Sequence, residues 1–247
     1  MNKKRVVLAG GSGFLGHALA TALRARRYEV VVLTRSPRER GDGVQEVAWD
    51  GVQAGAWIQA LEGADAVVNL TGRNVDCPHT PENLRVILSS RVDSVKAVAA
   101  GILQVPQPPR VWVQAGATGF YGDRGGELCT ENSSAGTNQL AEICRQWEDA
   151  FHAAQVSPTR RVLLRIGFVL GRESGALPVL SRLTKWFLGG TVGHGRQFIS
   201  WIHLADLTRM FVEAIERPEL SGTFNAVAPA PVTNREFMRE LRRALHR

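Results

Sequence analysis

The stretch that decides the fold is Val6-Val7-Leu8-Ala9-Gly10-Gly11-Ser12-Gly13-Phe14-Leu15-Gly16, residues 6–16. Its first part is a short apolar run, which is typical of a buried strand. Glycines follow at positions 10, 11, 13 and 16, and apolar residues then recur at helical spacing as far as Leu23. The stretch therefore predicts a strand, a tight turn and a helix, which is how a unit with parallel strands begins.

The glycines of this stretch fit both the GxGxxG and the GxxGxxG pattern. In that pattern the first glycines permit a tight turn, the middle one lets the backbone approach a pyrophosphate, and the last allows close packing of helix on strand. The start of the helix also presents free N–H groups to phosphates. We therefore expect a dinucleotide site at the loop residues Gly10, Gly11, Ser12, Gly13, Phe14, Leu15 and Gly16. The alternative is a glycine-rich turn without a ligand.

The end of the second predicted strand indicates which dinucleotide binds. That strand spans Val30 to Leu33 and is followed by Thr34 and Arg35. An NAD site usually has an acidic residue here, which bonds the ribose 2′-hydroxyl, whereas an arginine accommodates a 2′-phosphate. The sequence thus favours NADP(H) as the cofactor, and the alternative is that Arg35 is a solvated loop residue.

Strand-like and helix-like runs alternate along the rest of the chain, which predicts an α/β fold with a doubly wound parallel sheet. We expect a nucleotide-binding domain over residues 1–170 and a smaller substrate cap over 171–247, with parts of 197–230 packing back on the first domain. The predicted strands are 5–9, 30–33, 44–49, 64–70, 111–115, 161–170 and 198–203, and the predicted helices are 14–27, 81–102, 138–154, 178–188, 206–215 and 232–247.

Arg91 lies on the apolar stripe of the predicted helix 81–102, between Leu88 and Val95. A charged side chain on a buried face usually has a partner. That partner is either a phosphate of the cofactor or a structural carboxylate, and the sequence alone leaves both open.

Several motifs together resemble the extended short-chain dehydrogenase/reductases, and within them an atypical epimerase family subgroup labelled SulA-type nucleoside-diphosphate-sugar epimerases. The resemblance runs from about Val6 to the end of the chain, and its later motifs are more specific than the glycine loop. The motifs are Val67-Val68-Asn69-Leu70-Thr71-Gly72, Ser90-Arg91-Val92, Ala117-Thr118-Gly119-Phe120-Tyr121-Gly122, Gln146-Trp147-Glu148, Leu164-Arg165-Ile166-Gly167-Phe168-Val169-Leu170, Gly193-His194-Gly195-Arg196-Gln197-Phe198-Ile199-Ser200-Trp201-Ile202-His203 and Asn225-Ala226-Val227-Ala228-Pro229.

The resemblance implies a Rossmann-like sheet that binds NADP(H) and a C-terminal cap over the substrate. It also implies cofactor contacts at the glycine loop and at Thr34, Arg35, Leu70, Thr71, Arg91 and Val169. Because members of the family continue further, we expect the cap over 171–247 to be shortened relative to them.

The chain departs from the wider superfamily in its acid–base residues. Active members carry a Tyr-x-x-x-Lys pair on the helix after the fifth strand, where the tyrosine donates a proton and the lysine lowers its pKa. That pair is absent from this sequence, and Leu140 and Cys144 align near its two positions. Thr118 and Tyr121 are the remaining candidates for catalytic residues. For Tyr121, packing within the loop is the competing interpretation.

Composition and charge indicate which kinds of partner the protein binds. The 247 residues carry a net charge of +7, yet the arginines are interleaved with acidic residues and aromatic residues make up only 7%. We interpret this as a basic solvated surface with an anionic small ligand, and expect no nucleic acid and no membrane as partners. Three cysteines without a CxxC pair predict neither a disulfide framework nor a metal site, and favour a reducing, cytoplasmic location. A monomer or a homodimer is expected.

Two functions follow from the sequence. The first is an NADP(H)-dependent oxidoreductase or epimerase that acts on an unknown small polar substrate, with hydride transfer as its chemistry. The alternative is a non-catalytic NADP(H)-binding regulatory protein, for which the subgroup label suggests a link to cell division. The missing Tyr-x-x-x-Lys pair favours the alternative, while the glycine loop and Arg35 fit both.

Overall fold

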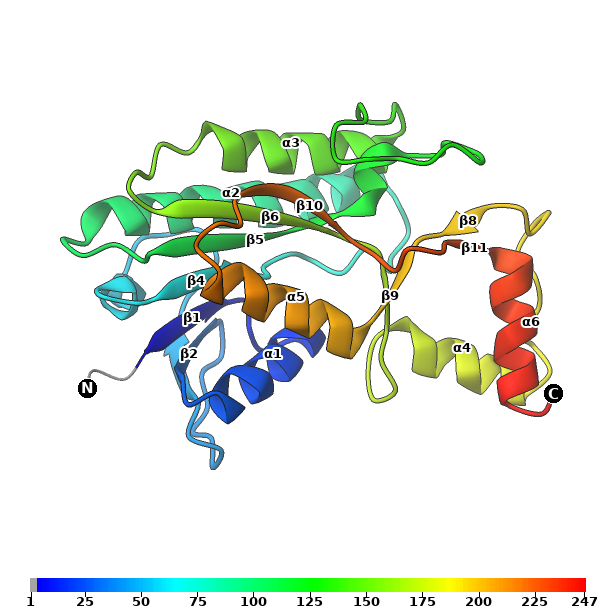
Figure 1. Ribbon diagram of the computed structural model, residues 1–247, viewed down its shortest axis with the longest axis horizontal. Coiled ribbons are helices and arrows are strands. Elements are labelled where there is room, and N and C mark those ends of the chain that lie inside the picture. Colours follow the sequence, from blue (N-terminus) through cyan, green and yellow to red (C-terminus); the bar gives the residue numbers. More distant parts are fainter. Residues whose placement is uncertain (1–3) are drawn as a thin grey trace.

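A computed structural model describes residues 4–247 of the chain (Figure 1). The first part of the chain forms β1 (Arg5–Ala9), α1 (Phe14–Ala25), β2 (Glu29–Thr34), β3 (Gln45–Ala48), η1 (Ala56–Leu61), β4 (Ala66–Asn69), α2 (Pro81–Gln104), β5 (Val111–Ala117), η2 (Thr118–Tyr121) and α3 (Gln139–Ala153). The second part forms β6 (Arg160–Ile166), β7 (Phe168–Leu170), α4 (Ala176–Lys185), β8 (Phe198–Ile199), β9 (Trp201–His203), α5 (Leu204–Glu216), β10 (Gly222–Ala226), β11 (Val232–Thr233) and α6 (Asn234–Ala244).

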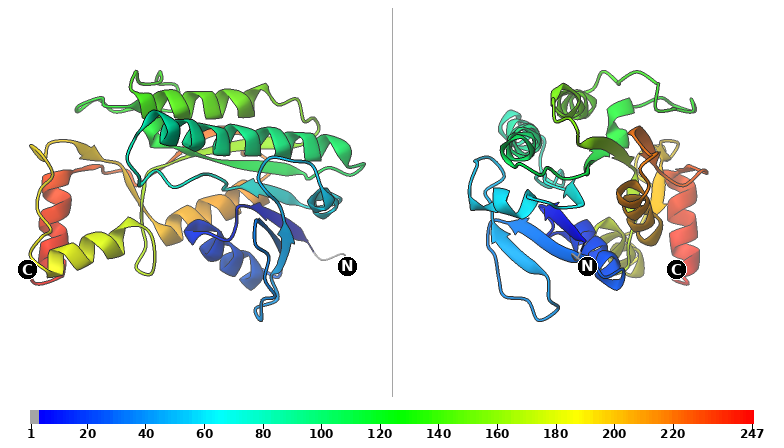
Figure 2. Two further views of the ribbon diagram at one scale, coloured as in Figure 1. Left: turned by 180° about the vertical axis from the view of Figure 1, so that it is seen from behind. Right: turned by 60° about the vertical axis from the view of Figure 1, so that its left-hand side comes forward.

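The central sheet of the described chain has seven parallel strands in the order β10-β6-β5-β4-β1-β2-β3. Helices α2 and α3 pack together on one face and α1 and α5 on the other (Figure 2). Its inner strands are mostly apolar because both faces are covered, and the side chains of Asn69 and Gln114 are buried polar exceptions. The expected doubly wound α/β fold is confirmed.

The strand order reverses beside β1, where the chain leaves first toward β2 and β3 and later toward β4 and β5. In such sheets ligands bind in the crevice at this switch point, outside the carboxyl ends of the strands. The glycine loop after β1, the end of β2 and the end of β4 all meet there, so the fold positions a site before any side chain is considered.

The C-terminal elements differ from the sequence expectations in how the strands are divided and in where the elements begin and end. The expected strand 161–170 is broken at Gly167 into β6 and β7, and β7 leaves the main sheet to pair with β9. A Cβ at Gly167 would lie 2.5 Å from the backbone oxygen of Ser200, so the close approach of the two segments requires glycine. Strand β10 was not predicted, because its sequence Gly-Thr-Phe-Asn-Ala carries little apolar pattern.

Other differences concern element boundaries. Helix α4 is Ala176–Lys185 rather than 178–188, and α5 is Leu204–Glu216 rather than 206–215. The expected strand 198–203 forms two short pieces, β8 and β9, in separate two-stranded sheets. The expected helix 232–247 begins only at Asn234, because Thr233 accepts a hydrogen bond from the Glu236 N–H and Glu236 bonds back to Thr233, a capping box that fixes the start of α6. Within residues 4–247, no helix combines the length and apolar character needed to cross a lipid bilayer.

Candidate functional site

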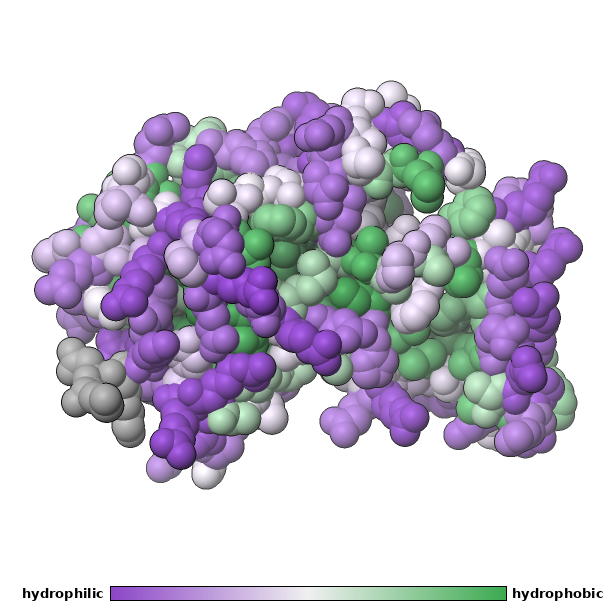
Figure 3. Space-filling view, in the orientation of Figure 1, coloured by the Kyte–Doolittle hydropathy of each residue, from purple (hydrophilic) through white to green (hydrophobic). Residues whose placement is uncertain are grey.

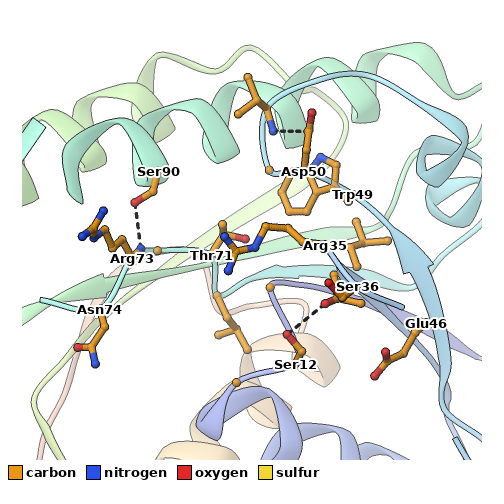
Figure 4. Close-up of a pocket in the computed structure, with 18 of the residues that line it drawn as sticks. Ser12, Arg35, Ser36, Glu46, Trp49, Asp50, Thr71, Arg73, Asn74 and Ser90 are labelled. Carbon is orange, nitrogen blue, oxygen red and sulfur yellow. Dashed lines mark hydrogen bonds between the residues drawn. The ribbon is translucent and has the colours of Figure 1, made fainter. Parts of the chain in front are cut away.

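A cavity of about 1060 Å³ opens at the switch point of the sheet. It is lined by the loop after β1, by the ends of β2 and β4, by the segment after β3 and by the first half of α2 (Figure 4). Of the residues expected from the sequence to hold a cofactor, the following line this cavity: Gly10, Ser12, Gly13, Thr34, Arg35, Leu70 and Thr71.

The glycine loop takes its shape from backbone contacts. Gly10 has φ of +71°, and a Cβ there would lie 2.8 Å from the Thr71 hydroxyl. At Gly16 a Cβ would lie 2.1 Å from the backbone oxygen of Gly11, so the first turn of α1 packs directly on the loop. Gly13 is different, because a Cβ there would meet no atom within 4 Å. Of the two loop glycines that line the cavity, Gly13 is the one with open space at its Cβ position.

Helix α1 begins at this cavity with unpaired donors. Gly13 is its N-cap and supplies no side-chain hydrogen bond, and its first turn holds no acidic residue. The N–H groups of the first turn lack intrahelical acceptors, and the helix dipole adds a partial positive charge at the same place. An anion such as a pyrophosphate would satisfy both.

Arg35 follows β2 and extends across the cavity toward Thr71 (Figure 4). Among the described residues it has no ion pair and no hydrogen bond, unlike Arg40 nearby, which is held by Asp42 and Glu46. Beside Arg35, the Thr34 hydroxyl donates to Ser12 Oγ at 3.3 Å, which connects the end of β2 to the glycine loop. The carboxyl end of β2 thus offers an unpaired guanidinium and two hydroxyls.

Thr71 is held by a buried side chain that the sequence did not single out as functional. Asn69 accepts a hydrogen bond from the Thr71 N–H and donates to Ser94 and Gln114, each at 3.1 Å. Its position at the end of an apolar strand was the available signal. The Thr71 hydroxyl itself is buried and has no protein partner, so it leaves a hydrogen-bonding group open at the cavity.

The other residues expected to contact the cofactor lie beside the cavity rather than in its lining. Gly11 and Gly16 pack the loop, Leu15 packs against the core, and Val169 lies in β7 beside Ile202 of β9. Phe14 turns toward the segment after β7, because Cβ atoms at Gly171 and Gly175 would contact its ring. The cavity also includes Ser36, Arg38, Trp49, Asp50, Arg73 and Asn74, for which the sequence carried no motif.

Among the described residues, Arg91 has no structural carboxylate partner, which was one of the two partners considered from the sequence. No carboxylate lies within ion-pair distance, and Nη1 donates to the carbonyls of Ile87 and Arg73 at 3.0 and 3.1 Å. The guanidinium stacks on Trp147, 5.1 Å from the ring centroid. Burial lowers the pKa of Arg91 from its ordinary value. Arg91 therefore links α2 to α3 at the carboxyl edge of the sheet and retains unused donors.

Thr118 and Tyr121 are the first and last residues of the short helix η2, which directly follows β5. The Tyr121 hydroxyl donates to Asn225 Oδ1 at 2.6 Å and accepts from Arg165 Nη1 at 2.8 Å. Thr118 donates to the Ile166 carbonyl at 3.5 Å. Neither residue lines the cavity at the switch point. Both hydroxyls already have protein partners.

Arg165 anchors this second cluster. Its guanidinium is paired with Glu148, with the closest contact at 2.8 Å, and both side chains are buried. Burial alone would lower the pKa of Arg165, but the hydrogen bonds to Glu148 and Tyr121 outweigh it and raise the pKa. Cys144 lies on the same helix as Glu148, and burial raises the pKa of its thiol to about 11. A thiol with that pKa stays protonated at neutral pH and cannot replace the charge of a lysine.

Most of the chain matches a known protein family. A family model described as the NAD dependent epimerase/dehydratase family matches residues 6–227. This chain belongs to that family. The resemblance to extended short-chain dehydrogenase/reductases, drawn from the sequence motifs, is thereby confirmed.

Relatives of this epimerase family chain cover almost all of its length. An epimerase family protein of Mycobacterium leprae is 37% identical over 250 residues, which are 99% of this chain and 78% of the relative. Human epimerase family protein SDR39U1 is 35% identical over 98% of this chain and 81% of its own length.

Two crystal structures share both fold and sequence with this family member. Human SDR39U1, solved with NADPH, has a TM-score of 0.89 and 33% identity, covering 98% of this chain and 80% of that chain. A nucleoside-diphosphate sugar epimerase of Corynebacterium glutamicum has a TM-score of 0.82 and 35% identity, covering 99% of this chain and 51% of that chain.

Proposed function

We propose that this protein binds NADP(H) in the cavity at the switch point. The observation that carries the proposal is Arg35, a guanidinium without a protein partner that extends into the cavity at the end of β2. A carboxylate at this place would repel a 2′-phosphate, whereas a guanidinium binds two phosphate oxygens at once. The Ser12 hydroxyl, which accepts from Thr34 and has its own proton to donate, lies beside the same place.

The residues present fit the rest of the cofactor. The first turn of α1 would hold the pyrophosphate, and the open space at Gly13 lets it approach the backbone. The partnerless Thr71 hydroxyl offers a hydrogen bond at the end of β4. The NADPH bound to human SDR39U1, a relative with the same fold and 33% identity, supports this choice of nucleotide.

For the activity we propose an oxidoreductase or epimerase acting on a small polar substrate. NADP(H), when bound, supplies a nicotinamide that gives or accepts a hydride. The protein's own part is to orient the cofactor through the glycine loop, Arg35 and Thr71. Residues 171–247 serve in this proposal as a cap beside the carboxyl edge of the sheet, and residues 1–170 as the nucleotide-binding domain.

A second candidate is a non-catalytic NADP(H)-binding regulatory protein. The observation that favours it is the state of the acid–base positions: Leu140 and Cys144 on α3 carry no charge, and the Tyr121 hydroxyl is engaged by Asn225 and Arg165. In this case binding of NADP(H) would stabilise one conformation of the protein, and the cofactor would not transfer a hydride.

One experiment in two stages tests both candidates. Titration with NADPH, followed by nicotinamide fluorescence, establishes the binding, and a protein that leaves the fluorescence unchanged contradicts the proposal. Single-turnover oxidation of bound NADPH is then followed against a panel of aldehydes and ketones, and epimerisation of sugar nucleotides by the protein loaded with NADP⁺ is followed by NMR. Consumption of NADPH or formation of an epimer supports the enzyme, whereas tight binding with neither across both panels favours the regulatory protein.

A further inference from the structure

Phe14 belongs to the glycine loop by sequence, but its ring does not line the nucleotide cavity. It is the first residue of α1, directly after Gly13, so its N–H is one of the free donors of the first turn. Its ring lies against the segment 171–175, which joins β7 to α4. We call this segment the strap. The backbone of Phe14 therefore belongs to the turn that faces the cavity, and its side chain contacts the strap.

Two glycines of the strap receive the Phe14 ring. A Cβ at Gly171 would lie 2.4 Å from Cζ of the ring and 3.4 Å from Cδ2 of Leu204 in α5. A Cβ at Gly175 would lie 3.1 Å from Cε1 of the ring, and the φ of Gly175 is +86°, which also favours glycine. The Phe14 ring thus occupies a slot that the strap forms because it has glycine at both ends.

The strap has few other contacts that hold it. Residues 172–175 are exposed, and none of their N–H groups donates to a backbone carbonyl within the part of the chain that the structure describes. Figure 1 shows the strap as a loop beside the start of α1, between α5 and α4. In the same orientation, Figure 3 shows hydrophilic surface at the strap and hydrophobic surface over α4. The position of the strap therefore depends on its two ends and on the Phe14 ring.

The first turn of α1 is open to stabilisation by a ligand. Its N-cap supplies no side-chain hydrogen bond, and the turn has no acidic residue. Such an N-terminus is held less firmly than a capped one, for example that of α2, where Thr80 accepts a hydrogen bond from the N–H of Asn83. A pyrophosphate bonded to the free N–H groups would hold this turn and, with it, the Phe14 ring.

We propose that Phe14 is a positioning residue that couples NADP(H) binding to the cap. When the pyrophosphate holds the first turn of α1, the Phe14 ring stays in its slot, and the strap fixes the place where α4 begins. Coupling between two sites is reciprocal, so a change in the strap must also alter the affinity for the nucleotide, although no strap residue lines the cavity. This coupling rests on the proposed function, because it requires NADP(H) at the switch point.

A double-mutant cycle on NADPH affinity, measured by fluorescence titration, tests the coupling. Gly171→Ala places a methyl group where the ring lies, so NADPH should bind about 5–20-fold more weakly. Phe14→Ala removes the ring but keeps the backbone N–H, and should weaken binding by a similar factor. The double variant should bind no more weakly than Phe14→Ala alone, because the methyl group then meets no ring. The matched control is Gly190→Ala, beyond the end of α4, where a Cβ meets no atom within 4 Å.

Limited trypsin cleavage supplies a readout that a loss of stability alone would not move. Arg172 places a cleavage site in the strap, and Arg124, in the loop before α3, provides a reference site. Saturating NADPH should slow cleavage after Arg172 by about fivefold in the wild type and change cleavage after Arg124 little. In Phe14→Ala saturated with NADPH, this slowing should be lost. The comparison is made with and without NADPH within each variant, and it decides the matter if Gly171→Ala fails to fold.

The coupling is wrong if Gly171→Ala binds NADPH like Gly190→Ala, if the effects of the two substitutions in the cycle simply add, or if Phe14→Ala keeps the slowed cleavage. NADPH binding by the wild type without slower cleavage in the strap overturns the coupling alone. A wild type that does not bind NADPH overturns the proposed function and the coupling together.

Discussion

Two arginines at the carboxyl edge of the same sheet illustrate how site and scaffold differ. Arg35 follows β2, is exposed, and has no partner among the described residues. Arg165 lies near the end of β6, is buried, and is bonded to Glu148, Tyr121 and the Glu131 carbonyl. Unused donors facing a cavity indicate a missing anion, whereas a satisfied buried network fixes the position of the elements it joins.

The same difference separates two hydroxyls, one in each region. The Thr71 hydroxyl at the nucleotide cavity is buried without a partner, while the Tyr121 hydroxyl in the second cluster has two. The Arg165 cluster joins α3, β6, β10 and η2. We therefore expect substitutions at the nucleotide cavity to lower NADPH affinity, and substitutions in the Arg165 cluster to lower the free energy of unfolding.

The largest effect should come from Glu148→Gln. It leaves the buried Arg165 without its carboxylate, so the free energy of unfolding should fall by about 3–5 kcal/mol. Urea denaturation measures this. Glu142→Gln on the same helix is the control, because its partner Arg145 is exposed to solvent and the substitution should change stability little. Equal losses in both variants would show that the Arg165 cluster is not a structural anchor.

Gly13→Val should lower NADPH affinity with little effect on stability, the opposite of Glu148→Gln. A Cβ at Gly13 meets no protein atom within 4 Å, so the valine would fill the space in front of the first turn of α1, and NADPH affinity should fall at least ~100-fold through the loss of charge-assisted hydrogen bonds. Thermal unfolding should change little. Gly16→Val is the counterpart, because its Cβ would collide with the Gly11 carbonyl and should destabilise the fold. Unchanged NADPH affinity in Gly13→Val would place the pyrophosphate elsewhere.

Arg35→Ala tests the unpaired guanidinium. One charge-assisted contact contributes roughly 1.5–3 kcal/mol, so NADPH binding should weaken ~10–150-fold. NADH affinity should stay nearly the same, because NADH lacks the 2′-phosphate. Arg35→Asp should reverse the preference, and Arg110→Ala, at an exposed site far from the cavity, serves as the control. An equal loss for both nucleotides would mean that Arg35 holds a group they share.

Tyr121→Phe should have the smallest effect on function. It removes the hydrogen bond to Asn225 and one to Arg165, which should lower the free energy of unfolding by roughly 1–3 kcal/mol. NADPH affinity should not change, and any NADPH-dependent turnover should stay within about tenfold of the wild type, below the ~10²–10⁴-fold expected for a general acid. A loss in that higher range would make Tyr121 the proton donor despite its partners.

The sequence predicted the fold because its signals are local. The glycine loop after an apolar run, and the β-branched strands alternating with amphipathic helices, specify the sheet without reference to distant residues. The break at Gly167 and the strand β10 were missed because they depend on packing against Ser200 and on pairing with β6, which no local pattern reveals.

The candidate site was predictable only where its residues belong to local motifs. Residues within the loop and at the strand ends were found, because parallel strands bring their carboxyl ends to one edge. Trp49, Asp50 and Asn74 were not, since only the folding of the segments after β3 and β4 places them at the cavity. The partners of Tyr121 and Arg91 also come from distant parts of the chain, and those contacts decide whether a polar side chain is free.

The central claim is that the unpaired groups at the switch point form a site for NADP(H). Parallel fluorescence titrations of the wild-type protein with NADPH and NADH, in one buffer and at one salt concentration, test it most directly. We predict that NADPH binds ~10–150-fold more tightly, the amount expected from one guanidinium–phosphate contact. Equal affinities would show that Arg35 does not meet a 2′-phosphate, and tighter binding of NADH would contradict the account outright.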